Sequence, residues 1–181
     1  ETGISYTEIQ YLVLDNYLIF LFVFVISSIS LYLYDNDESY IKKPKNKFSL
    51  SVFKFVSKII HISTIIIVSD SLLIDNFLGL EFHDNLLFSY IGISISSIAI
   101  ALFISSKITL GKNYSPCYDQ RKPKNITSSG LYKYVRHPIY SSNILLLIGT
   151  FVISGSYLML INIFILSFFY TISAYREEKY L

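Results

Sequence analysis

Apolar residues occupy long stretches of the chain that carry no Asp, Glu, Lys or Arg, and polar segments separate these stretches. The charge-free stretches are residues 16–34 (19 residues), 85–106 (22 residues) and 137–175 (39 residues). A helix that crosses the hydrocarbon core of a bilayer needs about 17–25 predominantly apolar residues. The first two stretches therefore each predict one membrane-spanning helix.

The third stretch is too long for one span. As a single helix it would extend about 58 Å at 1.5 Å per residue, roughly twice the hydrocarbon thickness. The sequence Ser154-Gly155-Ser156 lies near its middle and has the residue types of a turn. We therefore predict a tight helical hairpin, with helices over 138–153 and 157–175.

One further span is predicted between residues 51 and 73. The charge-free part, Ile59–Ser69, is too short to cross a bilayer alone. The longer segment can cross if Lys54 and Lys58 extend toward one membrane surface and Asp70 lies at the other. The alternative is a buried or interfacial helix. With this span, the predicted fold class is an all-α polytopic membrane protein with about five transmembrane helices.

The distribution of charge supports five spans. The 15 Lys and Arg residues fall in three places: six over 42–58, seven over 107–136, and Arg176 with Lys179. The segments 1–15 and 70–84 hold seven acidic residues and no Lys or Arg. Five spans place every basic segment on one side, whereas four or six would scatter them. The positive-inside rule then predicts an outside N-terminus and a cytosolic C-terminus, in a bacterial inner membrane or the endoplasmic reticulum.

Composition narrows the class of protein further. The chain has 52% hydrophobic, 17% aromatic and 15% charged residues, against about 25% charged in soluble domains. This excludes intrinsic disorder, and the single cysteine, Cys117, excludes an internal disulfide framework. The three histidines lack metal-ligand spacing, so no metal is expected. Phosphate-loop and dinucleotide glycine patterns are absent, which argues against nucleotide hydrolysis and Rossmann-type methyl transfer. No nucleic-acid partner is expected.

The candidate chemistry lies on the predicted cytosolic side. An antiparallel hairpin returns to its starting level, so Glu177 and Glu178 should lie beside His137 and Tyr140. Pro138 suits the first turn of a helix, and the start of that helix offers unpaired N–H groups to an anion. The glutamates offer negative charge to a cation. A zwitterionic cofactor with a carboxylate, an amine and a sulfonium would find a partner for each group.

The residues in this region form a recognisable pattern. Gly130, Tyr132 and the run Arg136-His137-Pro138-Ile139-Tyr140 match G-x-Y-x-x-x-R-H-P-x-Y, and E-E-x-x-L follows one hairpin later at Glu177–Leu181. Over about residues 110–181 the chain resembles the isoprenylcysteine carboxyl methyltransferases and the related membrane phospholipid methyltransferases. The resemblance implies methyl transfer from S-adenosylmethionine to a lipidic acceptor. We therefore divide the chain into two units: the three spans predicted over 1–109, then the cofactor loop, hairpin and Glu-Glu segment over 110–181.

The resemblance also implies roles for individual residues. Aromatic rings would stack on the adenine or face the sulfonium, and Glu177 would pair with the amine or ribose. Arg136 and Glu178 are candidate catalytic residues, and Arg176 is a candidate substrate ligand. An amine or thiol acceptor would need a base, for which His137 and Glu178 are candidates. The implied cofactor-binding residues are Lys124, Asn125, Ile126, Thr127, Tyr132, His137, Pro138, Ile139, Tyr140 and Glu177.

The sequence departs from the isoprenylcysteine pattern at one informative position. Those enzymes carry an Arg one helical turn before the glutamate pair, where it meets the substrate carboxylate. Here that position is Ser173, and Arg176 lies on another face of the helix. An amine-bearing phospholipid is therefore an alternative acceptor. Two further functions stay open: a sterol-type reductase that uses NADPH, and a non-catalytic subunit that binds lipid or a partner protein.

Overall fold

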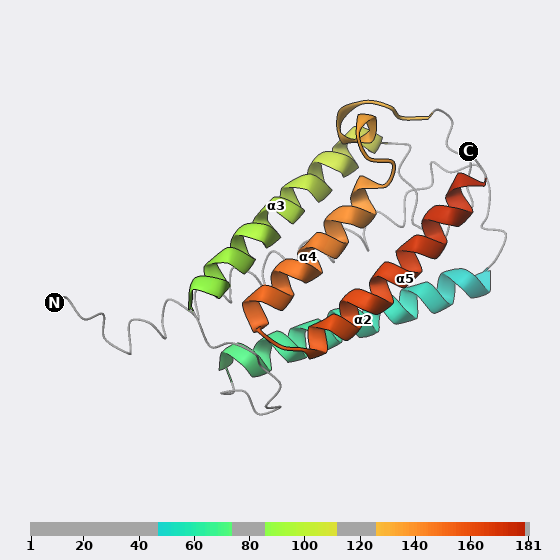
Figure 1. Cartoon of the computed structure of the whole chain (residues 1–181). Coiled ribbons are helices and arrows are strands. Elements are labelled where there is room, and N and C mark those ends of the chain that lie inside the picture. Colours follow the sequence, from blue (N-terminus) through green and yellow to red (C-terminus); the bar gives the residue numbers. More distant parts are fainter. Residues whose placement is uncertain (1–46, 74–85, 112–125, 180–181) are drawn as a thin grey trace.

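A computed structural model describes residues 47–73, 86–111 and 126–179 of the chain (Figure 1). The elements are four α-helices and one short 3₁₀ helix within these ranges: α2 (Lys47–Leu73), α3 (Leu86–Leu110), η2 (Gly130–Lys133), α4 (Pro138–Ser154) and α5 (Leu158–Glu178). The predicted all-α class is confirmed. The predicted span over 16–34 lies outside the described residues.

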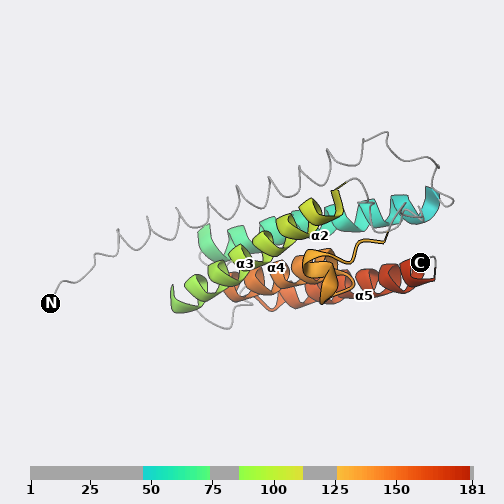
Figure 2. The same ribbon diagram turned by 90° about the horizontal axis from the view of Figure 1, so that it is seen from above.

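The helices α3, α4 and α5 lie next to one another and alternate in direction, and α2 crosses behind α4 and α5 (Figures 1 and 2). The most extensive packing is between α3 and α4, and η2 packs against α3. The predicted boundary between two units, after residue 109, falls in the last turn of α3 and stays a prediction.

The close packing of α3 and α4 depends on small residues. A Cβ atom added to Gly92 would lie 2.6 Å from the carbonyl oxygen of Gly149 and 2.7 Å from the backbone nitrogen of Ile153. A Cβ atom on Gly149 would in turn lie 2.9 Å from the carbonyl oxygen of Gly92. Small residues let two helix backbones approach closely, as in many membrane helix pairs. The two glycines therefore set the distance between α3 and α4.

The turn between α4 and α5 is the one that the sequence predicts. Gly155 ends α4 in the left-handed conformation, with φ 60°, and its N–H donates to the carbonyl of Phe151 at 2.9 Å. Glycine adopts this conformation without the steric cost that a Cβ atom brings. Pro138 is the first residue of α4, as predicted. The hairpin prediction is confirmed, although α5 continues three residues beyond Tyr175.

A buried polar contact joins α2 to α5. The side-chain amide nitrogen of Asn162 donates to Thr64 Oγ1 at 3.2 Å, and Ser63 Oγ donates to Asn162 Oδ1 at 3.0 Å. Asn162 and Thr64 are both buried. Hydrogen bonds of this kind are a common way to hold helices together where the surroundings are apolar. They place α2 against the hairpin.

Two of the described helices are long and apolar enough to cross a membrane: Leu87–Leu110 of α3 and the whole of α5. The 17 residues of α4 extend about 26 Å, somewhat less than the roughly 30 Å of hydrocarbon. The segment predicted as a span over 51–73 is helical, but Lys58 and Asp70 interrupt its apolar character and α2 is not among these two candidates. Five spans therefore stay a prediction.

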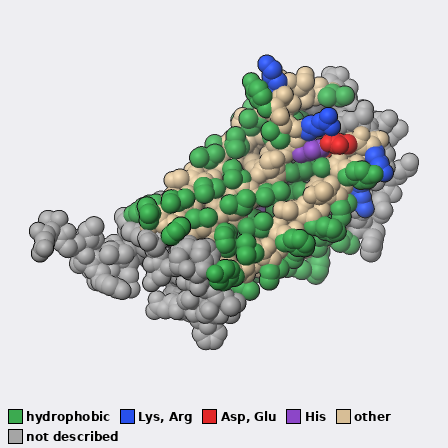
Figure 3. All heavy atoms as spheres, viewed as in Figure 1, with side chains coloured by type: hydrophobic (Ala, Val, Ile, Leu, Met, Phe, Trp, Pro, Cys, Tyr) green, Lys and Arg blue, Asp and Glu red, His purple; other side chains and the backbone are tan. Residues whose placement is uncertain are grey.

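The surface separates apolar from charged side chains. Hydrophobic side chains cover much of the face formed by α3, α4 and α5, and the visible Lys, Arg, Glu and His side chains gather at one end (Figure 3). Ile98 on α3 and Phe164 on α5, for example, are 56% and 74% exposed. Exposed apolar side chains along helices suit contact with lipid chains. The charged end includes the start of α4 and the end of α5.

Candidate functional site

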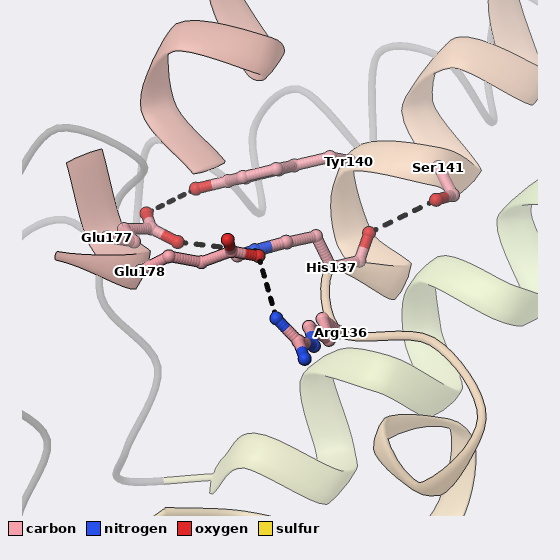
Figure 4. Close-up of polar contacts among 6 residues, drawn as sticks. All are labelled: Arg136, His137, Tyr140, Ser141, Glu177 and Glu178. Carbon is pink, nitrogen blue, oxygen red and sulfur yellow. Dashed lines mark hydrogen bonds and ion pairs between the residues drawn. The ribbon is translucent and has the colours of Figure 1, made fainter. Parts of the chain in front are cut away.

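The charged end contains a cluster of side chains from the start of α4 and the last turn of α5 (Figure 4). His137 immediately precedes the first residue of α4, and Tyr140 lies within the first turn. Because α5 runs back along α4, its last residues, Glu177 and Glu178, reach this level. Contacts between these four residues confirm the predicted proximity.

Glu177 contacts two aromatic side chains at once. Its Oε1 accepts a hydrogen bond from the hydroxyl of Tyr140, and its Oε2 lies 3.5 Å from Nδ1 of His137. Tyr140 is buried, whereas one third of the Glu177 side chain is exposed. The carboxylate is thus held in place on its inner side and accessible on its outer side.

Glu178 contacts the opposite nitrogen of the same imidazole ring. Its Oε1 lies 3.4 Å from Nε2 of His137 and 3.5 Å from Nη1 of Arg136. The Arg136 side chain is 83% exposed, and that of His137 is 20% exposed. His137 therefore lies between two carboxylates, and Arg136 forms the solvent-facing edge of the cluster.

Two residues that were not predicted from the sequence extend the cluster toward the interior of the bundle. The rings of His137 and Tyr140 stack with centroids 5.2 Å apart and planes 2° apart. Tyr140 also stacks with Tyr170, at 4.6 Å and 6°. The side-chain amide of Asn143 donates to the Tyr170 hydroxyl at 2.7 Å. Helical spacing could have revealed both, because Asn143 follows Tyr140 by three residues and Tyr170 precedes Glu177 by seven.

The start of α4 supplies backbone donors next to this cluster. The carbonyl of His137 accepts the first helical hydrogen bond, from the N–H of Ser141 at 3.1 Å. In any helix the N–H groups of the first turn have no helical acceptor, so they can bind an anion. Pro138 and Ile139, both predicted site residues, are the first two residues of α4 and are buried.

The remaining predicted cofactor-binding residues precede α4 in the chain, and two of them lie outside the described ranges. Tyr132 is half-buried in η2, which packs against the end of α3. Thr127 is half-buried and Ile126 is 71% exposed. Lys124 and Asn125 lie outside the described residues.

Two residues of α5 bear on the acceptor. Arg176, the candidate substrate ligand, is exposed one residue before the glutamate pair. Ser173, which occupies the position of the carboxylate-binding Arg in the isoprenylcysteine pattern, is buried.

Comparison with protein families agrees with this geometry. The profile of the phospholipid methyltransferase family matches residues 87–181, which is more than half of the chain and includes α3, α4, α5 and the cluster. The chain belongs to the phospholipid methyltransferase family. It is therefore a membrane methyltransferase that uses S-adenosylmethionine. Neither the search of curated proteins nor the search of solved structures found a match.

The side chains of this methyltransferase fit the chemistry of S-adenosylmethionine. The cofactor carries a carboxylate, an amine and a cationic sulfonium next to an adenosine group. The Glu177 and Glu178 carboxylates suit the cationic groups, the first turn of α4 suits the carboxylate, and the Tyr140 ring suits a stacked or cation–π contact. Each type of group has a complementary partner in the cluster, although the roles of the individual residues stay predictions.

The two glutamates also set the protonation of His137 in this methyltransferase. The hydrogen bond to Glu177 raises the pKa of His137 above its ordinary value, partial burial opposes the increase, and the charge of Glu177 and the contact with Glu178 add to it. The protonated imidazole is thus favoured between its two carboxylate partners.

This shift predicts a pH-dependent contribution to stability. Because the pKa of His137 is higher in the folded than in the unfolded chain, the protonated ring stabilises the fold. Relative to His137→Gln, this stabilisation should be complete below about pH 6.5, the ordinary histidine value. It should disappear as the pH rises through the higher folded pKa. Melting temperatures of both proteins from about pH 5.5 to 9 check this, and a gap that stays constant with pH would contradict it.

Proposed function

We propose that this methyltransferase transfers a methyl group from S-adenosylmethionine to the amine headgroup of a phospholipid at the cytosolic face of the membrane. The observation that carries the proposal is the pair of carboxylates, Glu177 and Glu178, on either side of His137 at the charged end of an apolar bundle. The proposal includes five spans with the N-terminus outside and the C-terminus cytosolic. It also includes the unit over residues 110–181, which contains the cofactor loop, the hairpin and the Glu-Glu segment.

The chain's contribution to the reaction is binding, alignment and exclusion of water. S-adenosylmethionine supplies an electrophilic methyl group on a sulfonium. Glu177 is proposed to bind a cationic group of the cofactor, and the start of α4 is proposed to bind its carboxylate. Tyr132 and Tyr140 are proposed to contact its aromatic or cationic parts. Holding both reactants in one orientation lowers the entropic part of the barrier. The apolar bundle keeps water from the acceptor.

The ammonium form of an amine acceptor has no free electron pair, so it must lose a proton before its nitrogen can attack the methyl group. The raised pKa of His137 favours its protonated form, which cannot accept a proton. Glu178 is more exposed than Glu177 and faces the outer side of the cluster with Arg136. We therefore assign Glu178 as the base for the amine, and Arg136 as the ligand of the lipid phosphate, since guanidinium groups bind phosphate oxygens well.

The site is less suited to a prenylcysteine carboxylate. His137 contacts both glutamate carboxylates, so its charge is already compensated. The buried Ser173 carries no charge at the position where the isoprenylcysteine pattern has an Arg. A negatively charged acceptor would meet two glutamates there, whereas an amine would be attracted to them.

An acceptor comparison tests the proposed function. The full chain would be reconstituted with tritiated S-adenosylmethionine and vesicles that contain phosphatidylethanolamine or N-acetyl-S-farnesylcysteine. We expect label in phosphatidylethanolamine at a rate at least about tenfold above that in farnesylcysteine, a difference of about 1.4 kcal/mol. Phosphatidylglycerol, which has similar acyl chains and no amine, is the control and should stay unlabelled. Preferential labelling of farnesylcysteine would contradict the amine assignment.

A further inference from the structure

Two hydrogen bonds connect α4 to α5 at successive levels near the site. At the outer level, the hydroxyl of Tyr140 on α4 donates to Glu177 on α5. At the inner level, Asn143 on α4 donates to the hydroxyl of Tyr170 on α5, at 2.7 Å. Asn143 lies one helical turn from Tyr140. The inner bond therefore fixes the relative position of the two helices immediately beneath the outer one.

Stacked rings join the two levels. The Tyr170 ring stacks on the Tyr140 ring with centroids 4.6 Å apart, and the Tyr140 ring stacks on His137. Tyr170 is only 7% exposed, and Asn143 is half-buried. A buried tyrosine whose hydroxyl is hydrogen-bonded has little freedom to rotate. The orientation of Tyr170 thus determines the plane that the Tyr140 ring adopts.

We propose that Asn143 and Tyr170 are positioning residues for the cofactor site of this methyltransferase. The inner hydrogen bond holds the Tyr170 ring, the Tyr170 ring holds the Tyr140 ring, and the Tyr140 hydroxyl in turn orients the Glu177 carboxylate. The inference rests on the proposed function, since it takes Tyr140 and Glu177 as cofactor ligands. Neither Asn143 nor Tyr170 belongs to the motif that identified the site.

The role predicts a specific change in cofactor affinity. Tyr170→Phe keeps the stacked ring and removes the hydroxyl, and Asn143→Leu removes the donor. One lost hydrogen bond of ordinary strength corresponds to about a threefold to tenfold weaker affinity. We expect this increase in the Kd for S-adenosylhomocysteine in each variant. The double variant should be within about twofold of either single variant, because both changes remove the same bond.

Isothermal titration of the full chain in detergent with S-adenosylhomocysteine measures this, and it separates positioning from folding. Misfolded protein lowers the number of binding sites per chain and leaves the Kd of the rest unchanged, whereas misoriented ligands raise the Kd at an unchanged number of sites. Tyr175→Phe, which removes an exposed tyrosine hydroxyl from the same helix, is the matched control and should keep the wild-type Kd.

Tyr140→Phe serves as the reference for the site itself. If it weakens binding while Tyr170→Phe and Asn143→Leu keep the wild-type Kd, the positioning role is wrong and the proposed site stands. If the two variants lose binding sites at an unchanged Kd, their role is structural and the inference is also wrong. If Tyr140→Phe alone binds as tightly as the wild type, the Tyr140 hydroxyl does not orient Glu177 and the inference is wrong, while the proposed site stands. If Tyr140→Phe and Glu177→Gln both bind as tightly as the wild type, the proposed site itself fails, and the inference fails with it.

Discussion

Glu177→Gln is expected to weaken the binding of S-adenosylmethionine by about 30- to 150-fold. The substitution keeps the size of the side chain and removes the charge that is proposed to attract the cationic part of the cofactor. It also removes the carboxylate that accepts from Tyr140 and lies 3.5 Å from His137. Loss of such a charged partner costs about 2–3 kcal/mol, which gives the stated range. Equilibrium dialysis of the detergent-purified protein against tritiated S-adenosylmethionine measures the change.

Lys58→Gln is the matched control for loss of one charge. Lys58 is exposed on α2, which lies outside the residues that match the family profile. Its substitution should leave the affinity within about twofold of the wild type, as expected for an exposed side chain without a role in binding. Equal retention of S-adenosylmethionine by Glu177→Gln and the wild type would remove Glu177 from the site.

Gly92→Ala is expected to destabilise the protein by about 2 kcal/mol, although the same change in most helices is favourable. Alanine is the better helix former by about 1 kcal/mol. Here, however, the added Cβ atom would lie 2.6–2.7 Å from backbone atoms of Gly149 and Ile153, which cannot move aside as a side chain can. Relief requires α3 and α4 to separate, and overpacking of this kind costs about 1–3 kcal/mol or more.

Thermal unfolding of the purified protein checks this expectation. A loss of about 2 kcal/mol corresponds to roughly 4–8 °C for a chain of this size. Ser94→Ala is the matched control, because Ser94 is exposed on the same helix two residues away. Its melting temperature should stay within about 2 °C of the wild type, since surface changes are usually small. If Gly92→Ala melts at or above the wild-type temperature, the tight contact between α3 and α4 is wrong.

The sequence was most informative where local chemistry decides the structure. The Ser154-Gly155-Ser156 turn could be predicted because only glycine adopts the left-handed conformation there at low cost. The hairpin geometry then determined that Glu177 and Glu178 return to the level of His137. The start of α4 at Pro138 could be predicted because proline, which has no N–H, suits the first turn of a helix.

Side-chain contacts between helices were harder to predict. The Asn143–Tyr170 bond and the stack on Tyr140 depend on how α4 and α5 are rotated about their axes, and this rotation is set by packing along the whole interface. Helical spacing puts Asn143 near Tyr140 and Tyr170 near Glu177, but it does not show that Asn143 and Tyr170 meet across the interface. The predicted span over 51–73 shows a different difficulty. There Lys58 and Asp70 interrupt the apolar residues, so the segment can be interpreted either as a span or as an interfacial helix.

Titration of the full chain with S-adenosylhomocysteine and, separately, with NADPH tests the central claim most directly. A methyltransferase with its cofactor site between the start of α4 and the end of α5 should bind S-adenosylhomocysteine at one saturable site per chain, and S-adenosylmethionine should compete for it. NADPH should show no saturable binding. Binding of NADPH without binding of S-adenosylhomocysteine would indicate a reductase instead. Failure of both to bind would contradict the assignment of a methyltransferase site at His137 and Glu177.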